Sequence, residues 1–114
     1  MLRALGSQSP ATNVQESASG LAASLELTPG NPNPFTSRTT LRLNLPEASY
    51  VTASIYDLAG RPVRRLLDGN LPAQERILVW DGRDDAAREV PSSVYFVRVT
   101  SAGDALSRRL VLVR

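Results

Sequence analysis

The sequence predicts an all-β fold, an antiparallel β-sandwich of about seven strands, on three observations. Short runs of residues alternate between apolar and polar side chains with a period of two, the pattern of a half-buried strand. Turn sequences rich in Pro, Gly, Asn and Asp separate these runs at intervals of roughly 8–12 residues. No long stretch carries the apolar stripe of an amphipathic helix. The chain has 114 residues, of which 42% are hydrophobic, which is enough for one domain with a packed core.

Residues 1–24 are predicted to be a flexible linker or tail, and residues 25–114 the folded domain. The first segment is rich in Ser, Ala, Gly, Asn and Gln, and its apolar residues are scattered without alternation. It lacks the apolar run of roughly 7–15 residues that a signal peptide needs. If the domain is exported, we therefore expect the export signal to lie on a larger parent chain.

Four strands are predicted from clear alternation, and three from weaker patterns. The clear ones are Thr40–Leu45, Tyr50–Tyr56, Arg76–Trp80 and Val94–Val99. The weaker ones are Leu25–Leu27, Pro62–Leu67 and Ala105–Val113. The residues expected to form the core are Leu41, Leu43, Leu45, Val51, Ile55, Val63, Ile77, Val79, Trp80, Tyr95, Val97, Val99, Leu110 and Leu112.

The composition argues against an enzyme. The chain has no cysteine and no histidine, which excludes thiolate nucleophiles, cysteine or histidine zinc sites and every catalytic triad that uses histidine. All 13 basic residues are arginines, against 11 acidic residues, so the net charge is +2 and is spread along the chain. This balance lacks the clustered basic stripe of nucleic-acid-binding proteins. We expect no catalysis, no cofactor, no small-molecule substrate and no nucleic-acid partner.

Carboxylates cluster in one place, the loop that contains Asp81, Asp84 and Asp85. Hard cations such as calcium prefer six to eight oxygen ligands, and three aspartates could supply several of them. The spacing is not that of an EF-hand, and Arg83 lies inside the loop, where it would compete for the carboxylates. A hairpin turn entered by Asp-Gly needs no metal. Turn chemistry is therefore the favoured interpretation, with a cation site as the weaker one.

The C-terminus ends on a basic, apolar, basic segment, Arg108–Arg114. Four consecutive apolar residues within it are typical of a strand that is buried on both faces. A final edge strand also offers main-chain groups to a partner, which can bind by adding a strand of its own. The residues alone favour an ordinary last strand with a charged edge, and they leave recognition, or self-association through an edge strand, as the alternative.

A second possible binding surface is aromatic. Tyr50 and Tyr56 are predicted to share one face of a strand, where they could contact a carbohydrate. Trp80 is more typical of a core residue than of a sugar-stacking platform. With one Trp, three Tyr and two Phe, the chain is poorly supplied for an aromatic binding strip.

A series of motifs in fixed order resembles a known family. The series begins with Asn31-Pro32-Asn33-Pro34-Phe35 and continues with Asp57-Leu58-Ala59-Gly60-Arg61, Trp80-Asp81-Gly82 and Tyr95 within Val94-Tyr95-Phe96. It closes with Arg108, Arg109, Leu110, Val111, Leu112, Val113 and Arg114. Over about residues 27–114 the chain resembles the type A C-terminal sorting domain of the bacterial type IX secretion system. That family is closely related to the Ig-like domain named after the flagellar hook-capping protein.

The resemblance implies an Ig-like sandwich that acts as an address label. Such domains lie at the end of a secreted protein, fold in the periplasm, and are recognised by an outer-membrane translocon. A sortase-like peptidase then commonly removes them, and the cargo stays at the cell surface or is released. On this basis the segment Arg108–Arg114 would be recognised by the translocon, and the Asn31–Phe35 loop would be mainly structural. The cargo would be covalently linked before residue 25. The alternatives are an Ig-like assembly module of a surface protein and a carbohydrate-binding β-sandwich.

Two positions depart from the family pattern. Ser93 and Ala87 stand where the family usually has glycine. We expect the turns at these positions either to have adapted to negative φ or to carry local strain.

Overall fold

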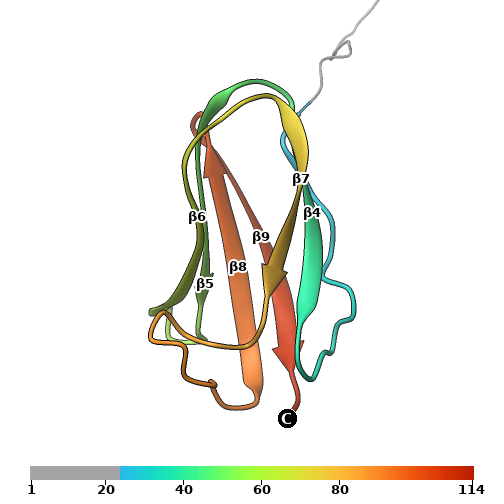
Figure 1. Ribbon diagram of the computed structural model, residues 1–114, viewed down its shortest axis with the longest axis vertical. Coiled ribbons are helices and arrows are strands. Elements are labelled where there is room, and N and C mark those ends of the chain that lie inside the picture. The colour runs from blue at the N-terminus through green and yellow to red at the C-terminus, as the bar shows by residue number, and fades with distance from the viewer. Residues whose placement is uncertain (1–23) are drawn as a thin grey trace, which may run out of the picture.

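The computed structural model describes residues 24–114, which form an all-β sandwich of two antiparallel sheets (Figure 1). This confirms the predicted Ig-like sandwich of seven strands. Among residues 24–114 no helix is suited to crossing a bilayer. The predicted linker, residues 1–24, lies outside the described residues except for Ser24. The strands are β3 (Glu26–Leu27), β4 (Thr39–Leu45), β5 (Ser49–Tyr56), β6 (Pro62–Leu71), β7 (Gln74–Trp80), β8 (Ser93–Ser101) and β9 (Asp104–Leu112).

The two sheets have different widths. Three strands form the smaller sheet in the order β3-β4-β7, and four form the larger one in the order β6-β5-β8-β9. The chain enters the sandwich at one end of its long axis and leaves it at the other (Figure 1). Strand β3 therefore begins near the end of the sandwich opposite to the C-terminus.

The core lies between the sheets and is centred on aromatic contacts. Trp80 is fully buried, and its ring makes edge-to-face contacts with Phe35 at 5.5 Å and Tyr95 at 5.1 Å between centroids. Its indole Nε1–H donates a hydrogen bond to the Arg83 carbonyl at 2.9 Å, which satisfies the one polar atom of the side chain. Eleven of the fourteen expected core residues are buried, and the core also contains Leu27, Phe35, Ala53 and Leu78.

The strand β7 was predicted correctly, but the prediction of its buried residues was wrong at two positions. Ile77 and Val79 were expected in the core, but they are 54% and 46% exposed, and Leu78 is buried instead. Successive side chains of a strand point to opposite faces, so the strand that buries Trp80 must also bury Leu78 and turn Ile77 and Val79 outward. Val63, the third exception, packs against the margin of the core and is partly buried.

Two turns with closely similar sequences repeat one hydrogen-bond pattern. In the first, the Asp57 carboxylate accepts hydrogen bonds from the main-chain N–H groups of Ala59 and Arg61 and forms a salt bridge with the Arg61 guanidinium. In the second, Asp84 does the same toward residues 86 and 88. The fourth residue has positive φ in both turns, 81° at Gly60 and 64° at Ala87.

The backbone angles at Ala87 and Ser93 show which expectation holds where the family usually has glycine. Ala87 keeps positive φ although it has a Cβ, so the expected adaptation to negative φ is wrong and the local strain is present. Ser93 begins strand β8 without positive φ, so a glycine is not needed there.

Ala87→Gly is expected to raise the free energy of unfolding by about 0.5–1 kcal/mol, because glycine adopts positive φ without steric cost. Gly60→Ala, at the matching position of the first turn, should lower it by about 1 kcal/mol. Ala86→Gly is the control, since residue 86 does not have positive φ and the change should destabilise. Urea denaturation measures all three. A loss of stability in Ala87→Gly equal to that in the control would contradict the strain.

The same turns make stability depend on acidity. The main-chain N–H of Arg61 lowers the pKa of Asp57 below its usual 3.8, and that of Arg88 does the same for the pKa of Asp84. A carboxylate whose pKa is lower in the folded state stabilises the fold above its usual pKa of 3.8. This stabilisation is lost as the pH falls through the pKa that the carboxylate has in the folded state. We expect the thermal midpoint to fall on acidification below about pH 4, and to fall less in the Asp57→Asn, Asp84→Asn double variant. Equal acid sensitivity of both proteins would contradict this role.

Candidate functional site

The C-terminal strand β9 is an integral part of the larger sheet. It pairs with β8 along its whole length, from Asp104 opposite Ser101 to Leu112 opposite Ser93. Its inward side chains Leu110 and Leu112 are 0% and 1% exposed. At Gly30 an added Cβ would lie 2.6 Å from Leu110 Cδ2, which shows how closely the preceding loop packs on this strand. Two of the seven residues predicted for recognition are therefore core residues.

The outer edge of β9 is covered near its end. The Phe35 N–H donates to the Val111 carbonyl and the Val113 N–H donates to the Phe35 carbonyl, both at 2.9 Å. The Asn33 side chain continues this pairing, because its amide accepts from the Val111 N–H and donates to the Arg109 carbonyl. The Asn31–Phe35 loop thus occupies the main-chain groups that a partner strand would need between Arg109 and Val113.

The three arginines of the segment differ in their contacts. Arg108 Nε donates to the Leu27 carbonyl at 2.8 Å and links the two sheets. The Arg114 guanidinium donates to the carbonyls of Val90 and Gly82, at 2.7 and 2.6 Å. Arg109 is exposed and points to the outer face, opposite Phe96. Arg109 is therefore the arginine that is free to contact a partner.

Gly82 of the Trp80-Asp81-Gly82 motif leaves room for the terminal arginine. Its φ is 73°, and an added Cβ would lie 2.8 Å from Arg114 Nη2. The motif and the C-terminus are 32 residues apart in sequence. They meet because β8 and β9 return the chain to the loop that follows β7.

Arg114→Ala is expected to lower the free energy of unfolding by about 1–2 kcal/mol, because it removes charge-assisted hydrogen bonds from two carbonyls. Arg109→Ala should change it by no more than about 0.5 kcal/mol. Urea denaturation of the two variants gives the comparison. Equal effects would contradict the different roles of these arginines.

The acidic loop uses its carboxylates to join elements of the fold. Asp81 Oδ1 accepts hydrogen bonds from the Arg64 guanidinium at 3.2 Å and from the Arg83 N–H at 3.1 Å. Asp85 Oδ1 accepts from the Arg65 N–H at the edge of β6, and Asp84 closes its own turn. Within residues 24–114 no three carboxylates converge on a point where a cation could bind. This arrangement favours the turn interpretation.

The remaining motif residues also lie at turns and in the core. Asp57, Gly60 and Arg61 form the first of the two similar turns. The Tyr95 ring packs on Trp80 and its hydroxyl donates to the Pro91 carbonyl at 2.6 Å, while burial raises the pKa of that hydroxyl. These contacts hold the loop between β7 and β8 against the sandwich.

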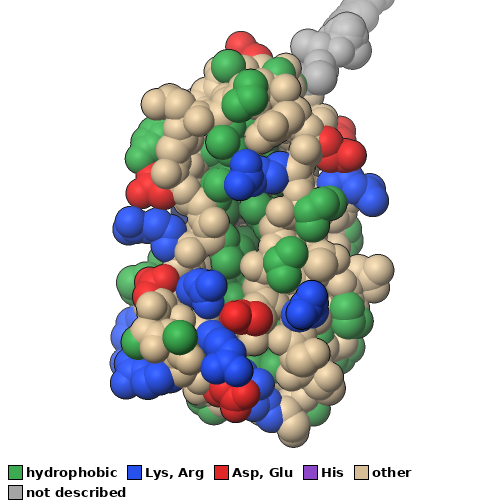
Figure 2. Space-filling model, viewed as in Figure 1, with side chains coloured by type: hydrophobic (Ala, Val, Ile, Leu, Met, Phe, Trp, Pro, Cys, Tyr) green, Lys and Arg blue, Asp and Glu red, His purple; other side chains and the backbone are tan. Residues whose placement is uncertain are grey.

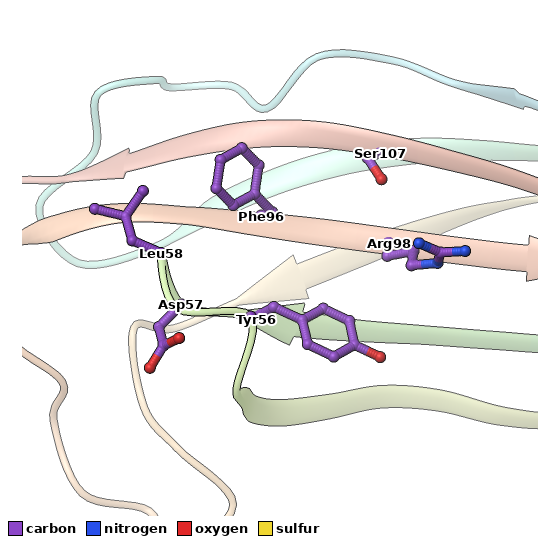
Figure 3. A pocket seen from close by; sticks show the side chains of 7 residues that line it. Tyr56, Asp57, Leu58, Phe96, Arg98 and Ser107 are labelled. Atoms are coloured by element: carbon purple, nitrogen blue, oxygen red, sulfur yellow. The ribbon is translucent and has the colours of Figure 1, made fainter.

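The outer face of the larger sheet carries a shallow depression of about 450 Å³. In Figure 3, Tyr56, Phe96 and Arg98 project from neighbouring strands on one side of the sheet, with Ser107 beside them on β9. Sequence reasoning missed Phe96 and Arg98, although their alternation with the core residues of β8 places them on this face. Tyr50 lies on the same face as Tyr56 but six residues away along β5, about 20 Å, so the two rings do not form one small carbohydrate site.

Comparison with protein families decides the relationship of the chain. Residues 33–105 match the model of the FlgD Ig-like domain. The chain belongs to the FlgD Ig-like domain family. Its match begins inside the Asn31–Phe35 loop and ends in β9, so it covers most of the sandwich. No curated protein sequence matches the chain.

Solved structures show the same fold. FlgD from P. aeruginosa is 26% identical with a TM-score of 0.50, over 65% of this chain and 59% of that one. Dimeric latent PorU from Porphyromonas gingivalis is 19% identical with a TM-score of 0.62, over 81% of this chain. PorZ from the same organism is 19% identical with a TM-score of 0.52, over 79% of this chain. The FlgD-family chain described here corresponds to only 10% of the PorU chain and 11% of the PorZ chain.

Proposed function

We propose that this FlgD-type Ig-like domain is a non-catalytic sorting domain that directs a covalently linked cargo across the outer membrane by the type IX secretion system. The observation that carries the proposal is the ordered series of motifs, from the Asn31–Phe35 loop to the closing segment Arg108–Arg114, within one Ig-like sandwich. The likeness in fold to PorZ, a bacterial surface component of that system, supports it. On this proposal the cargo is delivered to the cell surface or the medium.

The geometry suits an address label at the end of a longer protein. The described chain enters the sandwich at one end and its C-terminus lies at the other (Figure 1). A cargo that precedes β3 would leave the C-terminal end accessible to a translocon. A sortase-like peptidase would cut on the cargo side, before residue 25, without disturbing the core.

Fusion of a periplasmic reporter to residues 1–114 tests the proposal. In cells that possess the type IX pathway we expect the reporter at the surface or in the medium, and in cells that lack the translocon we expect it in the periplasm. The unfused reporter should stay in the periplasm of both strains. Periplasmic retention of the fusion in pathway-competent cells, with the domain folded, would overturn the proposal.

The test should use point variants rather than a shortened chain. Removal of residues 108–114 also removes the buried Leu110 and Leu112, so a failure to export would report unfolding as well as loss of a signal. Exposed side chains of β9 can be changed without this effect, and the stability of each fusion can be checked by protease resistance.

One observation favours an assembly module as the second candidate. The main-chain N–H and C=O groups of Thr40 form hydrogen bonds with Asn31, and the Arg42 carbonyl accepts one from Thr28, so these groups point away from β7. In an antiparallel sheet the direction of these groups alternates along a strand, so the residues between them, Leu41 and Leu43, are the ones that bond to β7. By the same alternation Ile77 and Val79 direct theirs to the open edge of β7. Both side chains are exposed, and hydrophobic groups lie on the surface over β7 and β4 in Figure 2.

An open strand edge with apolar neighbours can pair with a second copy of the chain. Light scattering of the purified domain tests this second candidate. A dimer that becomes a monomer in Ile77→Glu would favour the assembly module, and a monomer at all concentrations would count against it.

A further inference from the structure

The contacts of β9 leave one of its surfaces open to a partner. Leu110 and Leu112 point into the core, and the loop around Asn33 and Phe35 covers the outer edge from Arg109 to Val113. A partner that recognises this segment in the folded domain can therefore reach it through its outer face. That face is continuous with the outer faces of β8 and β5, because the three strands are neighbours in one sheet.

The pairing registers place aromatic and basic side chains side by side on this face. Tyr56 lies opposite Phe96, and Phe96 lies opposite Arg109, in one row across three strands. In the next row Arg98 lies between Ser54 and Ser107. Arg98 and Arg109 are thus diagonal neighbours across β8 and β9, within reach of one bound segment. We call Tyr56, Phe96, Arg98 and Arg109 the β8–β9 face.

The positive charge of the β8–β9 face is not neutralised by a salt bridge within residues 24–114. Seven arginines of residues 24–114 form salt bridges with aspartate or glutamate, but Arg98 and Arg109 are not among them. Asp57, at the rim of the depression, is already paired with Arg61. The face therefore presents two exposed guanidinium groups that form no salt bridge, next to the half-buried rings of Tyr56 and Phe96.

We propose that the β8–β9 face is where the sorting domain binds its receptor, through a receptor segment that carries carboxylates opposite Arg98 and Arg109. Guanidinium groups form paired hydrogen bonds with carboxylates, and the rings of Tyr56 and Phe96 add apolar area at the centre of the contact. The depression between them, about 450 Å³, accommodates one or two receptor side chains (Figure 3). The inference rests on the proposed sorting function and places recognition on β8 and β5 as well as on β9.

The test is delivery of the reporter fusion that carries Arg98→Glu and Arg109→Glu. We expect at least a tenfold loss of delivered reporter, because reversed charges repel an acidic partner. Arg98→Lys with Arg109→Lys keeps the charge and should deliver within about threefold of the parent domain. The matched control is Arg38→Glu with Arg76→Glu, which reverses two arginines that also lack salt bridges but lie outside this face, and it should deliver within about twofold.

The outcomes separate the two proposals. If the parent fusion is not delivered, the sorting function fails and this inference fails with it. If the parent fusion and the Arg98→Glu, Arg109→Glu fusion are delivered equally, only the receptor face is overturned. A loss that is equally large in the Arg38→Glu, Arg76→Glu control would also overturn it, because the effect would then follow net charge. Unchanged delivery, together with binding of a polygalacturonate oligosaccharide by the parent domain only, would assign the face to an anionic glycan instead.

Discussion

Leu110→Ala is expected to lower the free energy of unfolding by about 2–5 kcal/mol, a large effect for a single substitution. Leu110 is 0% exposed and lies between the loop at Gly30 and the core, so the removed methyl groups leave a cavity that the tightly packed loop cannot fill. The effect is large because the segment predicted for recognition is also a core strand. Chemical denaturation of the purified domain measures it.

Leu58→Ala provides the matched control for Leu110→Ala. Leu58 is 66% exposed in the first of the two similar turns, so the same chemical change should cost no more than about 0.5 kcal/mol. If Leu110→Ala were as mild as Leu58→Ala, the placement of β9 in the core would be wrong. Export of the Leu110→Ala fusion should fall in proportion to its unfolded fraction.

Phe35→Ala is the second large effect, with an expected loss of about 3–5 kcal/mol. The Phe35 ring is 2% exposed and packs edge-to-face on Trp80, and its main chain covers the edge of β9. Loss of the ring should release this edge, so we expect the Val113 N–H, which donates to the Phe35 carbonyl, to exchange with solvent faster. Hydrogen exchange followed by NMR measures the rate for this amide.

Asn33→Ala tests the covering of the β9 edge separately from the packing of the Phe35 ring on Trp80. It removes the two side-chain hydrogen bonds to β9 and leaves Phe35 in the core, so the expected loss is only about 1–3 kcal/mol. Faster exchange should then be largest at the Val111 N–H, which donates to the Asn33 side chain. A Phe35→Ala variant with parent-like stability would contradict the role of this loop.

The architecture could be predicted from local sequence because period-two patterns and turn residues act over a few positions. The weak pattern at Ala105–Val113 correctly indicated a last strand, observed as Asp104–Leu112. The buried face of β7 was predicted wrongly because four apolar residues follow one another from Ile77 to Trp80, and the pattern does not show which two are buried. The position of the facing sheet decides this, and it is a tertiary property.

The candidate site was harder to predict than the fold. The sequence indicated that Arg108–Arg114 was unusual, but the covering of its edge by Asn33 depends on residues 76 and 78 positions away. The pairing of Phe96 with Arg109 depends on the register between β8 and β9, which no local pattern specifies. The residues left the sign of φ at Ala87 open, and the structure shows that it is positive, as at Gly60 of the similar turn.

The most direct test of the sorting function is the fraction of a reporter fused to residues 1–114 that reaches the surface or the medium. The measurement compares pathway-competent cells with cells that lack only the type IX translocon. The proposed function predicts delivery in the first and periplasmic retention in the second, with the domain protease-resistant in both. The same distribution in both strains would contradict it, and the open edge of β7 would then make the assembly module the leading candidate.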